Sequence, residues 1–348
     1  MMHRRPTPRR SSTSKLSQYF IIFVFTLLIC TFVIVKELRD SSKDTALSQS
    51  LLNFADTAGH DYQLANDQSF GFFDDVPESE WKLLSNIVKE HENHAFMDQP
   101  LTFNPAWEKR TSKYFSSPRA WYQNNYEPNF SCRFERRIGG NGNGDGPKWV
   151  CDPHRLHRIS SERKAKNPNA PGCVVYSFGS NGDFSFEDGF QRALGKDTCE
   201  IHIFDMGDYE SKMPADLNLH YHKWGLMAEP EGYDKNDNND IKPENREFLT
   251  LRETVKVLGH EDLDAIDVFK IDCDKCEWKT FQDWVDPRMP RLQQILVETH
   301  NVPNKFVLSF FDTFEKEGYV RFHKEANVQF SDGDCFEYAF LKLDKEFF

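Results

Sequence analysis

The sequence predicts an α/β fold, a doubly wound and mostly parallel sheet covered by helices. From residue 171 onward, short apolar runs alternate with helical stretches of about a dozen residues, a pattern typical of parallel strands joined by helical crossovers. The last two apolar runs, 319–328 and 335–343, have no helix between them. We therefore expect an antiparallel pair at the end of the chain.

Each element follows from its own pattern. The apolar spacing in 79–96 predicts one amphipathic helix ahead of the sheet. The predicted parallel strands are 173–178, 200–205, 267–272 and 294–299. The predicted helices between and after them are 186–194, 248–259, a segment around 277–285, and 305–318. Residues 229–247 contain seven acids and three bases, which predicts a solvated insertion loop.

The N-terminus predicts a membrane anchor. Residues 16–35 are free of charge and long enough, as a helix, to cross the roughly 30 Å hydrocarbon layer of a bilayer. The preceding tail, 1–15, carries five Lys and Arg residues, which places it in the cytosol by the positive-inside rule. We expect a single-pass type II membrane protein of the Golgi or ER, with an uncleaved anchor, a stem over 36–96 and a lumenal domain over 97–348 whose core is 171–348.

Composition excludes one class of partner. The chain has 348 residues and a net charge of −12, and 14% of its residues are aromatic, which argues against disorder. Residues 1–40 carry seven basic and two acidic residues, so the remainder carries 36 basic and 53 acidic ones. A body this acidic is not expected to bind nucleic acid through its phosphates. Cys132 and Cys151 flank a glycine-rich stretch that a disulfide could close in an oxidising lumen.

The first candidate site is the turn after strand 173–178. It consists of Gly179, Ser180, Asn181 and Gly182. Glycines here let the backbone approach a ligand beside the N–H groups of a helix start. Asp205 ends the next strand, where a carboxylate is placed to accept the ribose hydroxyls of a nucleoside cofactor. Because glycine patterns for pyrophosphate and triphosphate are missing, the sequence favours a nucleoside without phosphates, such as S-adenosylmethionine.

The second candidate site is a group of acids after strand 267–272. It contains Asp272, Asp274 and Glu277, which we expect to face a ligand at the carboxyl end of the sheet. Mutual repulsion could make one of them a general base, and His300 is a further candidate. The D-x-D of Asp272 and Asp274 also leaves open a glycosyltransferase that holds Mg²⁺ or Mn²⁺ and a sugar nucleotide.

Other motifs predict less. Cys273 and Cys276 form a single C-x-x-C, so a four-cysteine zinc site is not expected, and a structural role is favoured over redox catalysis. The histidine pairs 154/157 and 220/222 lack carboxylate or cysteine companions at ligand spacing and are interpreted as surface or core residues. We therefore expect no metal site.

Taken together, residues 130–348 resemble methyltransferase-like proteins related to the FkbM methyltransferases. The resemblance is carried by the motifs CVVYSFGSNGDFSFEDGF, IHIFDMG, HKWGL, FKIDCDKCEW and QILVETH, in that order. It implies the class I S-adenosylmethionine-dependent fold, with a seven-stranded sheet whose last strand is antiparallel. Asp272 and Glu277 match the family pattern K-I-D-x-E-G-x-E, whereas Asp274 replaces a Glu and Lys275 replaces the Gly.

The resemblance implies a methyltransferase that uses S-adenosylmethionine. Gly179, Ser180, Asn181, Gly182 and Asp205 would bind the cofactor, and Asp272, Asp274, Glu277 and His300 are the candidate catalytic groups. We expect O-methylation of a glycan or small metabolite in the secretory lumen. The alternatives are the metal-dependent glycosyltransferase and a catalytically inactive lumenal binding module, which the Lys275 replacement favours.

Overall fold

The computed structural model describes residues 61–93, 122, 125–140, 146–230, 246–300, 306–331 and 334–348. Residues from Tyr62 to Phe348 form one compact unit. The anchor expected over 16–35 lies outside the described residues, as does most of the insertion loop expected over 229–247. Within the described ranges, no helix combines the length and the apolar character that crossing a membrane requires.

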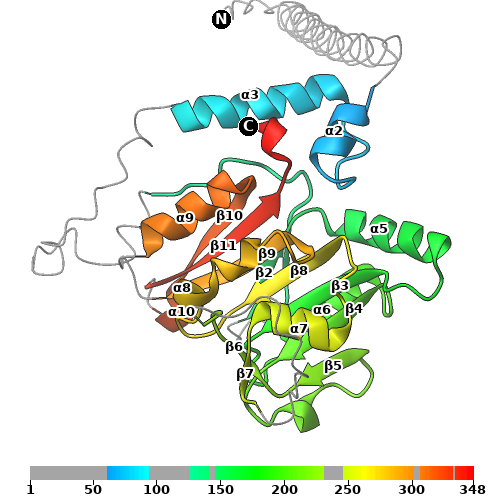
Figure 1. Ribbon diagram of the computed structural model, residues 1–348, viewed down its shortest axis with the longest axis vertical. Helices are drawn as coiled ribbons and strands as arrows, with labels where there is room; N and C mark the ends of the chain where they lie inside the picture. The colour runs from blue at the N-terminus through cyan, green and yellow to red at the C-terminus, as the bar shows by residue number, and fades with distance from the viewer. Residues whose placement is uncertain are drawn as a thin grey trace, which may run out of the picture. The chain divides into compact units, whose positions relative to one another are not determined.

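The described residues contain a central sheet of seven strands (Figure 1). In sheet order they are β10 (Tyr319–Asn327), β11 (Cys335–Lys342), β9 (Arg291–His300), β8 (Ala265–Ile271), β3 (Cys173–Phe178), β4 (Cys199–Phe204) and β5 (Leu219–His222). Strand β11 is antiparallel to both of its neighbours, and the remaining pairs are parallel. This confirms the predicted doubly wound sheet and its antiparallel C-terminal pair.

Helices cover both faces of the sheet (Figure 1). One face packs against α7 (Leu251–Leu258), α8 (Glu277–Thr280), the 3₁₀ turn η4 (Asp283–Val285) and α9 (Val307–Lys316). The other packs against α2 (Gln63–Gln68), α3 (Glu78–Asn93), β1 (Arg136–Ile138), β2 (Lys148–Val150), α5 (Pro153–Lys166), α6 (Ser185–Leu194) and η5 (Lys345–Phe347). Shorter elements near the carboxyl ends of the strands are η2 (Glu210–Lys212), β6 (Gly225–Leu226), β7 (Phe248–Leu249) and α10 (Val328–Ser331).

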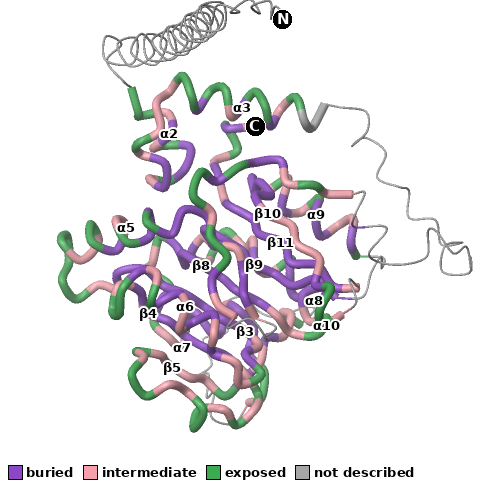
Figure 2. Tube along the Cα trace, turned by 180° about the vertical axis from the view of Figure 1, so that it is seen from behind, coloured by how far each residue is buried: buried purple, intermediate pink, exposed green. Residues whose placement is uncertain are grey.

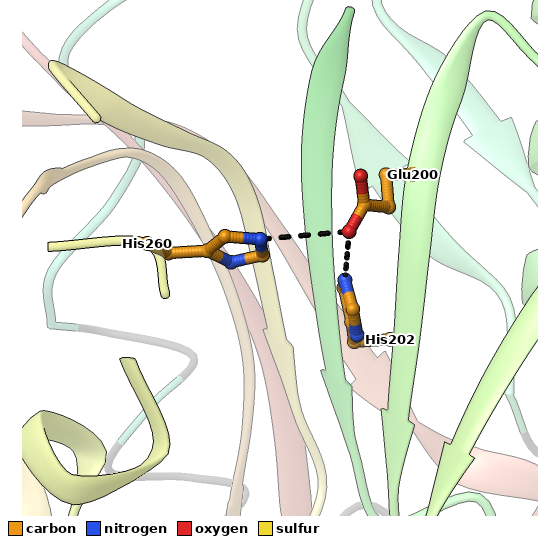
Figure 3. Close-up of side chains that lie close together, drawn as sticks. All are labelled: Glu200, His202 and His260. Atoms are coloured by element: carbon orange, nitrogen blue, oxygen red, sulfur yellow. Dashed lines mark hydrogen bonds and ion pairs between the residues drawn. The ribbon is translucent and has the colours of Figure 1, made fainter. Parts of the chain in front are cut away.

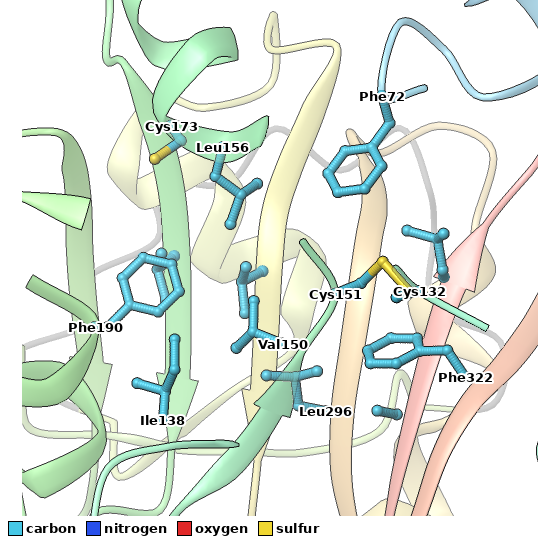
Figure 4. Close-up of a cluster of buried hydrophobic side chains, with 14 of the residues drawn as sticks. Phe72, Cys132, Ile138, Val150, Cys151, Leu156, Cys173, Phe190, Leu296 and Phe322 are labelled. Carbon is cyan, nitrogen blue, oxygen red and sulfur yellow. A yellow bond between two sulfur atoms is a disulfide. The ribbon is translucent and has the colours of Figure 1, made fainter. Parts of the chain in front are cut away.

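Each face has its own hydrophobic core. Aromatic side chains dominate the first, where Phe310 and Phe314 of α9 pack beside Trp284. Figure 4 shows the second, in which Val150 and Leu296 lie between Phe190 and Phe322. Strands β3, β8 and β9 are buried along almost their whole length, whereas α3 and α5 expose their outer surfaces (Figure 2). Central strands covered on both faces in this way read as continuous apolar runs, which is why the sequence predicts them.

Helix α7 begins later than the sequence predicts. A capping box sets its start, because the Thr250 side chain accepts the Glu253 N–H at 3.1 Å and the Glu253 carboxylate accepts the Thr250 N–H at 2.9 Å. The helix therefore cannot include 248–249, which pair with β6 as β7. Gly259 ends the helix with a φ of 68°, as the predicted glycine stop requires. The helix expected around 277–285 divides into α8 and η4.

The C-terminal part of the segment expected to be a stem packs against the domain. Trp81 of α3 is fully buried and donates its indole N–H to Gln68 Oε1 at 2.7 Å. Its ring lies 4.9 Å from the ring of Phe347, between centroids. Ser85 donates to the Phe347 carbonyl at 2.5 Å. Helix α3 is thus tied to the C-terminal turn of the same unit.

Three disulfides connect six of the described cysteines. Cys132 and Cys151 are joined, as the sequence suggested, and bring the chain before β1 to the end of β2. Cys173 and Cys199 are joined across the first residues of β3 and β4. The C-x-x-C cysteines, Cys273 and Cys276, are joined to each other across the turn after β8.

Candidate active site

A cleft of about 950 Å³ opens at the carboxyl ends of the parallel strands. It lies beside the central strand β3, whose neighbours β4 and β8 are reached by crossovers on opposite sides. Ligands of open α/β sheets bind at such a switch point. The two candidate sites from the sequence meet here, because the turn after β3 and the acids after β8 line the same cleft.

The glycine turn is fitted closely against the end of β8. Gly179 has a φ of 75°, and a Cβ at this position would overlap the carbonyl oxygen of Asp272. Its N–H donates to the Phe204 carbonyl at 2.9 Å. Lys270, which lines the cleft, donates to the Gly179 carbonyl at 2.6 Å. Only glycine fits this position, so its presence in the turn has a steric cause.

Asp205 holds this turn in place. Its Oδ2 accepts the N–H of Ser180 at 2.9 Å and the N–H of Asn181 at 2.7 Å. Its Oδ1 accepts the N–H of Gly207 at 2.8 Å. A carboxylate has about four acceptor positions, so Oδ1 keeps capacity for one more donor such as a ribose hydroxyl. The sequence placed Asp205 correctly at the cleft but did not predict its bonds to the turn.

The loop after β4 covers the outer side of the turn. Tyr209 donates its hydroxyl to Asn181 Oδ1 at 2.9 Å. A Cβ at Gly182 would lie 3.0 Å from the Tyr209 ring, so the second glycine allows this close packing. Asn181 has a φ of 47°, a left-handed conformation that Asn tolerates better than most residues. The predicted cofactor turn is therefore held from both sides.

Asp272 lies at the centre of a buried charge network. Lys148 of β2 is 1% exposed and places its ammonium 3.5 Å from Asp272 Oδ2 and 2.6 Å from Glu337 Oε1. Burial acts to raise the pKa of Asp272, but the ammonium groups of Lys148 and Lys270 outweigh it and hold this pKa at about 2. Asp272 is therefore an ionised carboxylate in the cleft at neutral pH.

Glu298 of β9 is held in the opposite state. Burial and the nearby Glu337 and Asp272 carboxylates together raise the pKa of Glu298 to about 8, although Lys148 acts to lower it. Glu298 is thus protonated at neutral pH and donates a hydrogen bond to Asp272. Asn327 donates its amide to Glu298 Oε1 at 2.8 Å. Two carboxyl groups with pKa values driven apart are typical of acid–base sites.

His300 is positioned by Glu277. The Glu277 carboxylate accepts the backbone N–H of His300 at 2.9 Å and its ring Nδ1–H at 3.1 Å. The other ring nitrogen, Nε2, lies 3.6 Å from Asp272 Oδ1. Burial acts to lower the pKa of His300, but the bond to Glu277 outweighs it and raises this pKa to about 9. Glu277 itself is fully buried, so the expectation that it faces a ligand is wrong.

The turn after β8 carries the remaining candidates. Asp274 is fully exposed, and its Oδ1 lies 3.8 Å from His300 Nε2. Asp274 and Lys275 have φ values of 51° and 85°, which favour glycine at both positions. The disulfide between Cys273 and Cys276 closes this turn. Lys275 therefore departs from the family pattern at a position where backbone conformation gives a reason for Gly.

Sequence reasoning missed three partners of the catalytic candidates. Lys148, Glu298 and Glu337 come from β2, β9 and β11, and only the folded sheet brings them together. Glu298 lies inside the predicted strand 294–299. Its charge next to an apolar run is the feature of the sequence that could have marked it as a site residue. Lys148 has no periodic pattern around it.

Comparison with protein families agrees with this geometry. A family described as "Methyltransferase domain" matches residues 63–342, most of the chain. The chain belongs to this methyltransferase family. The match begins with α2, so it includes the helices before the sheet as well as the cleft. The closer relation to FkbM-related methyltransferases stays a prediction. No curated protein matches the sequence significantly.

Three solved structures that are similar to this methyltransferase domain have low sequence identity to it. A proposed O-methyltransferase from Klebsiella pneumoniae is 11% identical, with a TM-score of 0.32, over 76% of this chain and 99% of its own. A proposed rRNA methylase from Clostridium thermocellum is 9% identical, with a TM-score of 0.31, over 50% and 88%. The plantazolicin methyltransferase BpumL, solved with a triazolic desmethylPZN analog and SAH, is 9% identical, with a TM-score of 0.26, over 77% and 100%.

Proposed function

We propose that this methyltransferase domain transfers a methyl group from S-adenosylmethionine to an oxygen atom of a small metabolite or glycan. The observation that carries the proposal is the meeting of two groups in one cleft. The turn at Gly179 and Asp205 offers a nucleoside site, and Asp272 and His300 offer charged groups beside it. Methyl transfer needs these two functions side by side, because the enzyme must align donor and acceptor.

Apolar side chains beside Asp205 supply a surface for the adenine ring. Met206 and Phe248 are 51% and 39% exposed, although both are large and apolar. Both line the cleft together with Leu226. A Cβ at Gly225 would lie 3.1 Å from each of Met206 and Phe248, so this glycine leaves room between them. A planar base against such side chains would remove apolar surface from water.

The acid end of the cleft supplies the proton acceptor. An acceptor hydroxyl must lose its proton as the methyl group arrives, and an ionised carboxylate can accept that proton. We assign this role to Asp272, which lines the cleft. The protonated His300 ring, whose Nε2 lies 3.6 Å from Asp272 Oδ1, orients this carboxylate while Glu277 holds Nδ1. Glu277 is then a positioning residue. Asp274 lies at the exposed rim of the cleft and is assigned no catalytic role.

The same proposal includes the compartment. The uncharged run 16–35 and the basic tail before it support a type II anchor with the domain in the lumen of the Golgi or ER. Three disulfides support an oxidising compartment. Within the methyltransferases, Lys270, Asp272 and Glu277 support a place beside the FkbM-related proteins.

The D-x-D geometry favours methyl transfer over metal-dependent glycosyl transfer. Two cationic groups, the Lys148 ammonium and the His300 ring, flank Asp272, and Asp274 projects into solvent. A divalent ion held by both aspartates would have to compete with those cations.

The proposal is tested by calorimetric titration of the full chain with S-adenosylmethionine and, separately, with UDP-glucose plus Mn²⁺. We expect saturable binding of one S-adenosylmethionine per chain and none of the sugar nucleotide. Manganese-dependent binding of UDP-glucose without S-adenosylmethionine binding would replace the proposal with glycosyl transfer. Binding of neither would leave the inactive binding module as the better account.

A further inference from the structure

A second group of titratable residues lies away from the cleft, on the face of the sheet that α7 covers. Strand β4 presents Glu200 and His202 at alternate positions, and β5 presents His220 and His222 in the same way. In the parallel register His202 lies opposite His220. Side chains two residues apart share one face of a strand, so these four project together. The sequence pairs E-x-H and H-x-H show this only when the strands are placed side by side.

Three of these side chains converge on one point. Figure 3 shows His202 and His260, from different elements, aimed at the Glu200 carboxylate. Glu200 Oε1 lies 2.7 Å from His202 Nε2 and 3.5 Å from His260 Nε2. The three ligand atoms lie within 4.8 Å of one another. His260 follows the C-terminal glycine of α7, and its N–H donates to the Val255 carbonyl at 3.0 Å, which fixes its backbone.

These distances are close to those of a zinc site. Zinc binds imidazole nitrogen and carboxylate oxygen at about 2.1 Å, which separates tetrahedral ligands by about 3.4 Å. The Glu200–His260 distance already has this value. The Glu200–His202 distance would have to lengthen by about 0.7 Å.

The second ring nitrogen of each histidine has a hydrogen-bond partner that is compatible with a bound metal ion. His202 Nδ1 lies 2.8 Å from His222 Nε2, and His260 Nδ1 lies 2.7 Å from the Tyr176 hydroxyl. An imidazole and a phenol can each donate or accept a hydrogen bond. When Nε2 of a histidine binds a metal, its Nδ1 carries the proton and needs an acceptor. Tyr176 and His222 can provide one, which is the outer-shell support that metal-binding histidines have.

We propose that Glu200, His202 and His260 bind one zinc ion. Two imidazoles and one carboxylate are donors that zinc accepts, and three protein ligands leave a fourth position for water. The ion could reach the site from solvent past Glu200, whose side chain is 33% exposed. His202 and His260 are buried behind it. This replaces the expectation from the sequence that no metal site exists.

The ion would stabilise the fold and would take no part in methyl transfer at the cleft. Glu200 stands near the amino end of β4, whereas Asp205 follows the carboxyl end at the cleft, roughly 16 Å away along a strand. Zinc would join β4 to the connection between α7 and β8 through His260. Because it would bind only the folded chain, it would stabilise the domain by mass action.

The test measures zinc bound to the full chain. The protein is stripped with a chelator, dialysed against ZnCl₂ and passed over a desalting column before elemental analysis and zinc X-ray absorption. We expect one zinc per chain, coordinated by nitrogen and oxygen without sulfur, and a rise in Tm on adding zinc. Glu200→Gln and His260→Gln should each bind zinc at least tenfold more weakly and lose the Tm rise.

Two control variants make the result specific. His157→Gln, on the exposed side of α5, should keep one zinc per chain. Cys335→Ser should also keep it, which separates this site from the buried group of Glu298, His300 and Cys335 at the cleft. Circular dichroism identifies variants that do not fold, and Glu200→Gln is the least disruptive because its side chain is partly exposed. A wild-type chain without bound zinc, or folded variants that bind it as tightly as wild type, would overturn the proposal.

Discussion

Glu277 and His300 form a buried pair in which one carboxylate oxygen accepts both the backbone N–H and the ring N–H of the histidine. The pair lies at the junction of α8 and β9, so it links the turn after β8 to the strand that carries Glu298. It explains why His300 is charged in the folded protein even though it is buried.

The charge on His300 predicts a pH dependence of stability. Because the pKa of His300 is raised to about 9 from an unfolded value near 6.5, its contribution is complete below pH 6.5 and is lost as the pH rises through 9. The shift corresponds to about 3 kcal/mol. Urea unfolding at pH 6.5 and 9.5 should show a larger loss of stability for wild type than for His300→Gln. An equal loss in both proteins would contradict the assignment, and His157→Gln should behave as wild type.

Much of the fold could be predicted from the sequence, because β3, β8 and β9 are buried on both faces and so are apolar throughout. The site could be predicted only in part. Gly179 and Asp205 stand next to strand ends, where local pattern is informative. Lys148 is brought to Asp272 by tertiary structure alone. Trp81 packs against the C-terminal turn, a contact hidden by the polar composition around it.

We expect replacement of Lys148 by an uncharged residue to cause a large loss of stability. Glu298 and Glu337 lie directly opposite each other in the β9–β11 pair, and the Lys148 ammonium is within 4.0 Å of both. The same ammonium supplies the counter-charge for Asp272 and Glu337. Lys148→Met should therefore cost about 3 to 5 kcal/mol in urea unfolding, because buried carboxylates lose their counter-charge. Lys256→Met, on the exposed side of α7, should change stability by less than about 0.5 kcal/mol. Similar values for the two variants would exclude the proposed network.

We expect substitution of Gly179 to have a steric cost that can be separated from the cost of its positive φ. Gly179→Ala meets the Asp272 carbonyl oxygen and also has a positive φ, so it should cost more than about 3 kcal/mol of stability. Gly259→Ala has a φ of 68° but no atom within 4 Å, so it should cost only about 1 kcal/mol. The two variants are compared by thermal unfolding. Equal costs would mean that the turn is less closely packed than described.

We expect replacement of Lys275 by glycine to stabilise the folded protein. Its φ of 85° is unfavourable for a residue with a Cβ, and glycine removes this cost at the expense of a more flexible unfolded chain. Lys275→Gly should raise stability by about 0.5 kcal/mol in urea unfolding. Lys256→Gly within α7 should have the opposite sign, with a loss of about 0.7 kcal/mol. A destabilised Lys275→Gly would show that the lysine side chain contributes more than its backbone costs.

The most direct test of the central claim, a cleft that binds S-adenosylmethionine through the β3 turn and Asp205, is the cofactor affinity of matched variants by calorimetry. Asp205→Asn exchanges one acceptor oxygen for a donor that faces backbone N–H groups, so it should weaken binding at least tenfold. Asp208→Asn, three residues later with an exposed side chain, should bind as wild type. Unchanged affinity in a folded Asp205→Asn, or an equal loss in both variants, would contradict the account.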